Sequence, residues 1–264
     1  MIDTPQRRLL LVFVAYHPSA DEVACLRQCL AKLPSQIGYA LAVNDYISGE
    51  PIADLAPGAD HVMLNSDNPG YGRAVNRLVR SLTIEPSFLG VLNTDLCWEE
   101  GMFSHLLRMM ESSDDLVLAV PQIVDPSGEP QQLCKRNPTV LALLSRRFVP
   151  RWLKPMWLRR YDHWFVMADH DQNQPIESTY LSGCCMVIRS DAFRHIGGFD
   201  ERFFLYLEDA DLTRSLASVG RCLHLPDVSV THGWGRGNYR SLRLMFVNFV
   251  SAWIYFRKWG WALW

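Results

Sequence analysis

The sequence of 264 residues lacks the features that mark several large classes of protein. It has no stretch of 18 uninterrupted apolar residues, which argues against a membrane-spanning helix. Its N-terminus carries two arginines but no long apolar segment with a small-residue cleavage site, so we do not expect a signal peptide. The seven cysteines include no CxxC pair, and we expect them to be reduced, buried thiols of a cytosolic protein.

Two further absences narrow the choice of ligands. The formal net charge of −2 gives no general attraction to nucleic acid, so any anion site must be local. Neither a GxGxxG fingerprint after the first apolar run nor a P-loop pattern is present, which argues against the two commonest nucleotide-binding loops. The 48% of hydrophobic residues nevertheless suffices for a sizeable core.

Short apolar runs that resemble buried strands alternate with segments whose apolar residues recur at helical spacing. The apolar runs lie near residues 9–15, 39–44, 61–65, 88–92 and 116–120. The helical patterns lie at residues 21–33 and 99–111. A further helix, which ends at residue 82, opens from the glycine-punctuated turn SDNPGYGRAVN. This rhythm predicts an α/β fold: a doubly wound, mostly parallel sheet flanked by helices, with right-handed crossovers.

Polar side chains follow three of the expected strands: Tyr16 and His17, then Asp45, then Asp95. In open α/β sheets, ligands bind at the carboxyl ends of the strands, near the point where the strand order reverses. Each of these residues alone is a weak signal, because Asp and Asn are ordinary turn residues. Together they supply acids for a base or ribose edge and for a metal.

The richest stretch runs from residue 180 to residue 220 and contains three carboxylates at the start of an expected helix: Glu208, Asp209 and Asp211. The helix dipole stabilises acids in a first turn, which explains one or two of the three. Glu208 and Asp211 share one face, whereas Asp209 points about 200° away from Asp211, toward the side that packs. A carboxylate there is partly desolvated and binds a proton more tightly, so Asp209 is our candidate for a general base.

Two segments interleave basic and aromatic residues. Within residues 125–177, which are rich in proline, residues 146–164 place six arginines and lysines among three tryptophans. This segment is either an amphipathic insertion with a solvated basic face or a lid that meets an anionic, lipid-bearing partner. Residues 241–264 form either an interfacial amphipathic helix or a helix that completes the core. We therefore expect one domain over residues 1–240, with 125–177 as a variable insertion or acceptor-side segment, followed by this helix.

His232 ends an expected strand and precedes a loop that contains Gly233, Gly235 and Gly237. A lone histidine is usually structural, but these glycines permit a close approach of the backbone to a ligand. Arg236 in the same loop can pair with phosphate. We therefore expect His232 to have a phosphate or metal role.

These motifs together resemble the inverting glycosyltransferases of family 2, which have the GT-A fold. The resemblance is strongest to the bacterial rhamnosyltransferases that build O-antigen and related surface polysaccharides, and it spans roughly residues 10–237. The residues that carry it are Asp45-Tyr46-Ile47-Ser48, the turn NPGYGRAVN from Asn68 to Asn76, Asn93-Thr94-Asp95, and the run GGFDERFFLYLEDADL from Gly197 to Leu212.

The resemblance implies roles for individual residues. In the family, one aspartate contacts the nucleotide base, a strand-end acid holds a metal, and the second acid of the E-D pair is the catalytic base; these roles carry over to Asp45, Asp95 and Asp209. A histidine after the last core strand, often near the metal or diphosphate, carries over to His232. The donor site is expected to include Tyr16, Asp45, Ser48, Asn68, Gly70, Arg73, Asn76, Asn93 and Thr94. The acceptor side and its surroundings are expected to include Glu208, Gly183 and Arg236.

Two positions depart from the family pattern. Tyr46 replaces an asparagine of the base-binding motif, and the D-x-D of many relatives is reduced to Asp95, with Asn93 in the other place. One carboxylate, His232, water and the donor diphosphate can still fill an octahedral Mg²⁺ or Mn²⁺ shell. We therefore expect weak metal binding in the absence of the donor.

The implied reaction moves a sugar from a nucleotide-diphosphate donor, with dTDP-rhamnose favoured, to a hydroxyl of a polyprenyl-diphosphate-linked saccharide. The expected location is cytoplasmic, peripheral on the inner face of the bacterial plasma membrane, without a nucleic-acid partner. A UDP-hexose or galactofuranose transferase of the same fold is the alternative. In other classes, a nucleotidyltransferase usually has a basic glycine-rich loop after the first strand, which is absent, and a non-catalytic sugar-nucleotide binding module does not require the E-D pair.

Overall fold

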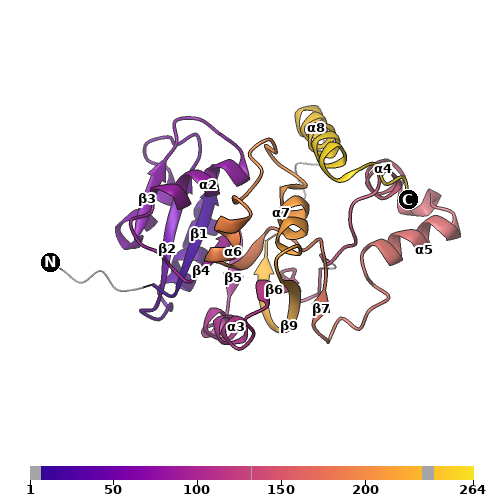
Figure 1. Ribbon diagram of the computed structural model, residues 1–264. Helices are drawn as coiled ribbons and strands as arrows, with labels where there is room; N and C mark the ends of the chain where they lie inside the picture. Colours follow the sequence, from indigo (N-terminus) through magenta and orange to yellow (C-terminus); the bar gives the residue numbers. More distant parts are fainter. Residues whose placement is uncertain (1–6, 132, 234–240) are drawn as a thin grey trace.

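The computed structural model of the protein describes residues 7–131, 133–233 and 241–264, and one sheet of nine strands runs through it (Figure 1). Its strand order is β3-β2-β1-β4-β8-β6-β9-β5, and β7 pairs with β9. The strands are β1 (Leu9–Ala15), β2 (Ile37–Val43), β3 (His61–Leu64), β4 (Phe88–Leu92), β5 (Leu96–Trp98), β6 (Leu116–Val124), β7 (Ile176–Glu177), β8 (Cys185–Arg189) and β9 (Arg221–His232).

The helices lie at both faces of the sheet and in a separate group near the C-terminus. They are α1 (Ala20–Leu30), η1 (Pro51–Gly58), α2 (Tyr71–Ser81), α3 (Met102–Glu111), α4 (Val140–Phe148), η2 (Arg151–Leu153), α5 (Met156–Phe165), α6 (Ser190–His195), α7 (Glu208–Leu216) and α8 (Leu242–Trp259).

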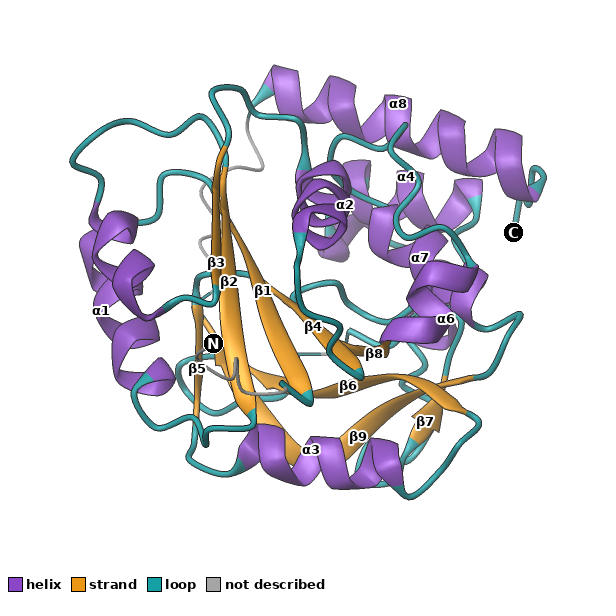
Figure 2. Cartoon of the chain, turned by 60° about the vertical axis from the view of Figure 1, so that its left-hand side comes forward, coloured by secondary structure: helices purple, strands orange, loops and turns teal. Residues whose placement is uncertain are grey.

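The first half of the sheet is parallel, as the sequence predicts. β1 pairs with β2 and β4, and β2 pairs with β3, all in parallel register. Every residue of β1 is buried, which is typical of a parallel strand covered on both faces. These strands separate α1 from α2 (Figure 2), since the chain crosses over in opposite directions from β1 to β2 and from β3 to β4.

The second half of the sheet is mixed. β8 lies antiparallel between β4 and β6, whereas β6 and β9 are parallel. β5 follows β4 after only three residues and pairs antiparallel with the end of β9, so that Leu96 lies opposite His232. This pairing brings residues that lie far apart in the sequence to one edge of the sheet.

A second hydrophobic core lies outside the sheet, between α4, α5, α7 and α8. Tyr255 and Phe256 of α8 are buried in it, while Phe246 and Trp253 on the same helix are exposed. One face of α8 therefore completes a core, as one of the two alternatives has it, while an interfacial role for the exposed face stays a prediction. Among the described residues, no helix is both long enough and apolar enough to cross a bilayer.

The cysteines correct one expectation. Cys25 of α1 and Cys97 of β5 form a disulfide, so the prediction that all seven thiols are reduced is wrong for this pair. The sequence hid the pairing because the two residues are 72 positions apart, and only the packing of α1 against β5 brings their Cα atoms to 6.3 Å. The other five cysteines are free and buried, as expected.

Candidate active site

The ends of β1 and β2 carry a group of polar side chains. His17 Nε2 lies 3.4 Å from Asp45 Oδ2, and His17 Nδ1 contacts Glu50 Oε1. Both His17 and Asp45 have positive φ angles, 47° and 54°, which turn the chain sharply after each strand. The hydrogen bond with Glu50, followed by that with Asp45, raises the pKa of His17. The ring of Tyr16 lies beside that of His17, with centroids 4.5 Å apart and the planes tilted by 53°.

The turn before α2 is fitted to the aromatic run of the central stretch. Asn68 Oδ1 accepts a hydrogen bond from Gly70 N, at 3.0 Å, and Tyr71 N donates to Phe204 O, also at 3.0 Å. Gly70 has φ = 92°, and a Cβ at this position would lie 2.4 Å from Phe204 O. Only glycine fits here, because any side chain would collide with the neighbouring backbone.

Arg73 and Asn76 of α2 tie the same two motifs together. Asn76 is buried, donates through Nδ2 to Phe199 O at 2.8 Å and accepts from Phe199 N at 3.0 Å. Arg73 donates to Glu201 O at 2.8 Å. Both side chains therefore hold residues 199–201 against α2. The expected contact of these two side chains with a donor stays a prediction. Because both are bonded to the chain itself, we expect them to act on the donor through residues 199–201.

Asp95 and His232 lie side by side, as expected. His232 Nε2 is 3.1 Å from Asp95 Oδ2, and Gly233 N donates to Asp95 O at 3.0 Å. The pair results from the register of β5 and β9, which sets Leu96 opposite His232. His232 is buried, and its Nδ1 has no hydrogen-bond partner among the described residues.

The short loop that contains Gly183 and Cys184 connects the Asp95–His232 region to the start of α7. Asn93 N donates to Cys184 O at 3.0 Å, and Gly183 N donates to Asp209 Oδ2 at 3.1 Å. A Cβ on Gly183 would lie 2.9 Å from Asp209 Cβ, so this close approach requires glycine. The pKa of the Cys184 thiol is raised to about 12, mainly by burial and further by Asp95 and Asp209. The thiol therefore lies within electrostatic reach of both carboxylates.

The acids of α7 separate as helix geometry predicts. Asp211 is buried on the opposite side, where it accepts hydrogen bonds from Lys258 Nζ at 2.8 Å and Trp259 Nε1 at 2.7 Å. Asp209 faces Gly183, and its Oδ1 accepts from Ala210 N at 2.8 Å. The buried Oε2 of Glu208 has no hydrogen-bond partner in the described part of the chain. Of the three carboxylates, Asp211 thus anchors α8, and Glu208 and Asp209 are the candidates for proton transfer.

Burial controls the proton affinity of these two acids. Burial, and then the charge of Asp209, raise the pKa of Glu208 to about 8. Burial also raises the pKa of Asp209, against the opposing effects of Lys135 and of the N–H groups of Gly183 and Ala210. Lys135 lies over the ring of Tyr180, with Nζ 4.4 Å from the centroid. Its pKa is lowered by burial, and Asp209 opposes that shift.

The Asp95–His232 pair fits a divalent cation. An octahedral ion with bonds of about 2.1 Å places neighbouring ligand atoms about 3 Å apart, close to the observed 3.1 Å. The two side chains offer one carboxylate oxygen and one imidazole nitrogen, and no third His, Cys or acid joins them in a cluster among the described residues. Further ligands would have to come from substrate or water.

Other expected residues occupy varied positions. Asn93 and Thr94 are half-buried between β4 and β5, Ser48 is exposed after β2, and Arg236 lies outside the described residues. Sequence reasoning missed Glu50 and Lys135, and it noted His17 without giving it a role. His17 directly follows a strand, which is a usable signal, but neither Glu50 nor Lys135 stands in a recognisable pattern.

No family model matches the chain, but it is similar to known proteins in sequence and in fold. Over 237 residues, 85% of the chain and 75% of the relative, it is 29% identical to N-acetylglucosaminyl-diphospho-decaprenol L-rhamnosyltransferase of Mycobacterium tuberculosis, strains CDC 1551 / Oshkosh and ATCC 25618 / H37Rv.

Solved structures show the same fold. GalNAc-T7 with UDP, GalNAc and Mn²⁺ has a TM-score of 0.62 at 15% identity, covering 88% of this chain and 45% of its own. The mannosyltransferase PcManGT of Pyrobaculum calidifontis, in complex with GDP-Man and Mn²⁺, has a TM-score of 0.60 at 12% identity, covering 95% of this chain and 65% of its own. The chain thus spans less than two thirds of these structures.

The chain therefore has the GT-A fold of these glycosyltransferases. Within that type, the resemblance to family 2 and its rhamnosyltransferases is confirmed by the mycobacterial relative.

Proposed function

We propose that the chain is an inverting glycosyltransferase that moves L-rhamnose from a nucleotide-diphosphate donor, dTDP-rhamnose, to a hydroxyl of a lipid-linked saccharide. The observation that carries this proposal is the position of two carboxylates around one loop. Asp209 accepts a hydrogen bond from Gly183 N, and Asp95 follows the strand end whose Asn93 N donates to Cys184 O. The candidate base and the candidate metal-binding acid therefore lie on either side of the two residues Gly183 and Cys184.

The donor side is built for recognition. Asp45 is exposed at the end of β2 and presents carboxylate oxygens to a nucleobase, while His17 and Glu50 fix the loop around it. The half-buried Asn93 and Thr94 lie at the neighbouring strand end, before Asp95. A nucleotide-diphosphate sugar would lie across these strand ends, since ligands of open α/β sheets bind there.

Asp95 and His232 would hold a Mg²⁺ or Mn²⁺ ion, which supplies positive charge to the diphosphate as the leaving group departs. Asp209 takes the proton from the acceptor hydroxyl. The acceptor oxygen attacks the anomeric carbon on the face opposite the diphosphate, so one displacement inverts the configuration. Asp209 suits this role because burial raises its pKa and so its proton affinity, while the charge of Lys135 opposes part of that rise.

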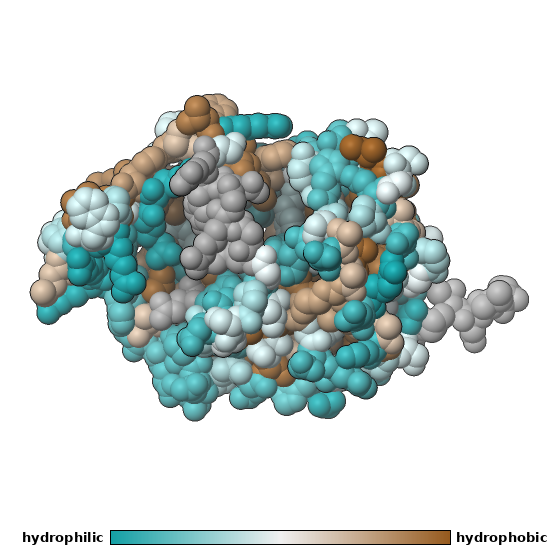
Figure 3. Space-filling model, turned by 180° about the vertical axis from the view of Figure 1, so that it is seen from behind, coloured by the Kyte–Doolittle hydropathy of each residue, from teal (hydrophilic) through white to brown (hydrophobic). Residues whose placement is uncertain are grey.

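The sugar and the acceptor are taken from the mycobacterial relative, whose name gives L-rhamnose and a decaprenol-diphosphate-linked N-acetylglucosamine. A lipid-linked acceptor also suits the outer helices of this chain. Most of its exposed large hydrophobic side chains belong to the segment with α4, η2 and α5 or to α8 and the residues after it. In Figure 3, apolar residues gather along the upper edge, where α8 lies.

We call these outer residues, 144–164 and 242–264, the aromatic-basic platform. They contain seven arginines and two lysines but a single acid, Asp162, which is paired with Lys154. Such a surface favours the anionic face of a membrane, where the charges attract the lipid head groups and the tryptophans lie at the interface. Flotation with anionic and with zwitterionic vesicles tests this part. Binding to the anionic vesicles alone is expected, and binding to neither would contradict it.

The test of the proposed activity is a panel of nucleotide sugars. dTDP-rhamnose with Mn²⁺ or Mg²⁺ is expected to raise the melting temperature more than UDP-hexoses do. Mass analysis of a synthetic polyprenyl-diphosphate N-acetylglucosamine should then show the addition of one deoxyhexose. Asp45→Ala serves as a matched control, because it should weaken the protection without changing the fold. Protection by no nucleotide sugar would overturn the proposal, and protection by a UDP-hexose alone would replace the donor.

A further inference from the structure

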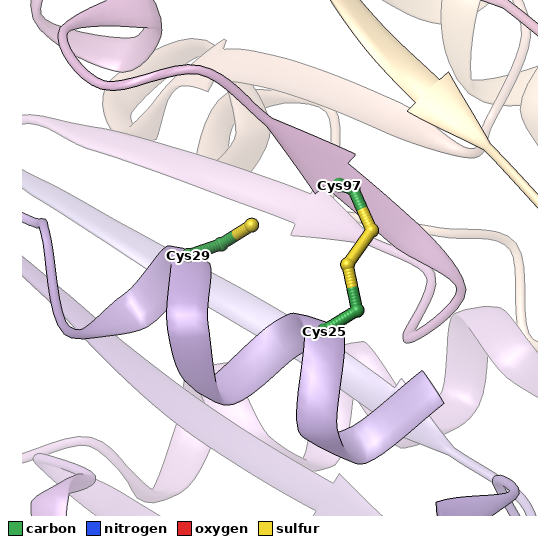
Figure 4. A group of neighbouring side chains, drawn as sticks. All are labelled: Cys25, Cys29 and Cys97. Atoms are coloured by element: carbon green, nitrogen blue, oxygen red, sulfur yellow. A yellow bond between two sulfur atoms is a disulfide. The ribbon is translucent and has the colours of Figure 1, made fainter. Parts of the chain in front are cut away.

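Three cysteines meet on the side of the sheet that α1 covers (Figure 4). Cys25 and Cys29 are four residues apart on α1, and Cys97 projects from β5. Their sulfur atoms all lie within 4.8 Å of one another. Residues at i and i+4 share a helix face, which is why one helix supplies two of the three.

This group differs from the other cysteines of the chain. Cys134, Cys184, Cys185 and Cys222 are free and buried, like small hydrophobic residues in a core. Cys25 and Cys97 are half-buried and open to reagents from solvent, whereas Cys29 is buried behind them. Cys29 is held in place by the backbone of β5, since its Sγ lies 3.5 Å from Trp98 N and 3.6 Å from Trp98 O.

We propose that Cys25, Cys29 and Cys97 form a thiolate site for a soft metal ion of the Zn²⁺ class, which is open to the ion in the reduced protein and closed by the Cys25–Cys97 disulfide. Thiolate sulfurs bonded to Zn²⁺ at about 2.3 Å stand just under 4 Å apart in tetrahedral geometry. The three sulfurs need only small movements to reach that spacing once the disulfide is open. The fourth position would be taken by water, because Cys25 and Cys97 are accessible.

The two states are linked by balanced chemistry. Two molecules of a low-molecular-weight thiol reduce the disulfide; the S–S bond breaks, each cysteine sulfur gains a hydrogen, and the reductant becomes a disulfide. Each of the three thiols then gives its proton to solvent when its sulfur bonds the ion. While the disulfide is closed, two of the three ligands are unavailable and the ion cannot bind.

The site also has a structural consequence. Cys97 stands two residues after Asp95, and the intervening Leu96 pairs with His232. Either the disulfide or the bound ion fixes β5 against α1, and therefore supports the strand that carries Asp95. This inference does not depend on the proposed transferase activity, since it concerns binding of the metal alone.

Cobalt is the probe that separates this site from others, because Co²⁺ bound to thiolates gives a sulfur-to-metal charge-transfer absorption. Protein reduced anaerobically is titrated with Co²⁺. We expect the band to saturate at one equivalent, to disappear when Zn²⁺ is added, and to be absent from protein that retains the disulfide. Asp95→Asn should keep the band, which distinguishes the thiolates from the candidate metal pair.

Cys29→Ser should abolish the band, whereas the matched control Cys134→Ser, which removes another buried thiol, should keep it. Circular dichroism checks that both variants fold. If Cys29→Ser does not fold, the half-exposed Cys25→Ser carries the test with the same expected loss. A reduced wild-type protein without the band, or a folded Cys29→Ser or Cys25→Ser variant with the full band, would overturn the proposal.

Discussion

The two halves of the candidate site hold their carboxylates in opposite ways. At the ends of β1 and β2, Asp45 is exposed and shares His17 with Glu50. At the start of α7, Glu208 and Asp209 lie against a packed core, and burial raises both pKa values. In the proposed function, the carboxylate group therefore serves recognition on the first side and proton transfer on the second, because its environment differs.

The neighbouring cations reinforce this difference. His17 is held beside its acids by hydrogen bonds on both ring nitrogens, and its own pKa rises in consequence. Lys135 acts on Asp209 through charge, while its ammonium rests on Tyr180. His17 thus fixes the loop after β2, whereas Lys135 lowers the proton affinity of Asp209, the proposed base.

Asp209→Asn is expected to have the largest effect. Loss of the general base should lower kcat by about 10³-fold or more, because the amide cannot accept the proton. Donor affinity, measured by calorimetry, should change little. Asp211→Asn is the matched control on the same helix, since its carboxylate binds Lys258 and Trp259. It should lower the melting temperature but keep most of the turnover. Near-normal turnover of Asp209→Asn would show that another residue is the base.

Asp45→Ala should act on the other half alone. Removing a charged hydrogen-bond partner of the nucleobase is expected to raise the KM for the donor by about 10-fold to 100-fold. The value of kcat at saturating donor should stay close to that of the wild type. Steady-state kinetics measure both parameters, and a fall in kcat without a change in KM would mean that Asp45 does not bind the donor.

Lys135→Met tests how the charge of Lys135 affects the pKa of Asp209. The ammonium opposes the effect of burial, so its removal should raise the pKa of Asp209 further. The acidic limb of the profile of kcat/KM against pH should then move upward, and on that limb a pKa higher by about one lowers the rate about tenfold. Lys135→Arg should restore the profile. An unchanged acidic limb would show that Lys135 does not influence the pKa of Asp209.

Glu208→Gln should act on stability rather than on turnover. The folded protein raises the pKa of Glu208 from 4.5 to about 8, so the folded state binds the proton more tightly than the unfolded state. Between these two pKa values, the wild type therefore loses about 1.4 kcal/mol of stability for each pH unit by which the pH rises. The variant should match the wild type below this window and melt at a higher temperature above it. Parallel melting curves at both ends measure the difference; equal curves throughout would contradict the burial of this acid.

The sequence predicts the first half of the fold well, for a physical reason. β1, β2 and β4 are largely buried on both faces and read as continuous apolar runs, so their type follows from local pattern. The helix at Glu208 and the separation of Asp209 from Asp211 follow from helical geometry, and the structure confirms both.

The rest depends on contacts that local pattern does not encode. Lys135 reaches Tyr180 across 45 residues, and Asn76 reaches Phe199 across 123. Local pattern also gave no sign that the side chain of Asn76 joins α2 to the backbone of Phe199. The disulfide escaped prediction for the same reason, because β5 returns to α1 only in the folded sheet.

The central claim is that a sugar carbon lies between the base on α7 and the diphosphate held at the end of β4. A crystal structure with Mn²⁺ and a non-transferable nucleotide-diphosphate sugar tests it directly. We expect the diphosphate beside Asp95 and His232, with the anomeric carbon facing Asp209 past Gly183. A diphosphate bound elsewhere, or an anomeric carbon turned away from Asp209, would contradict the account.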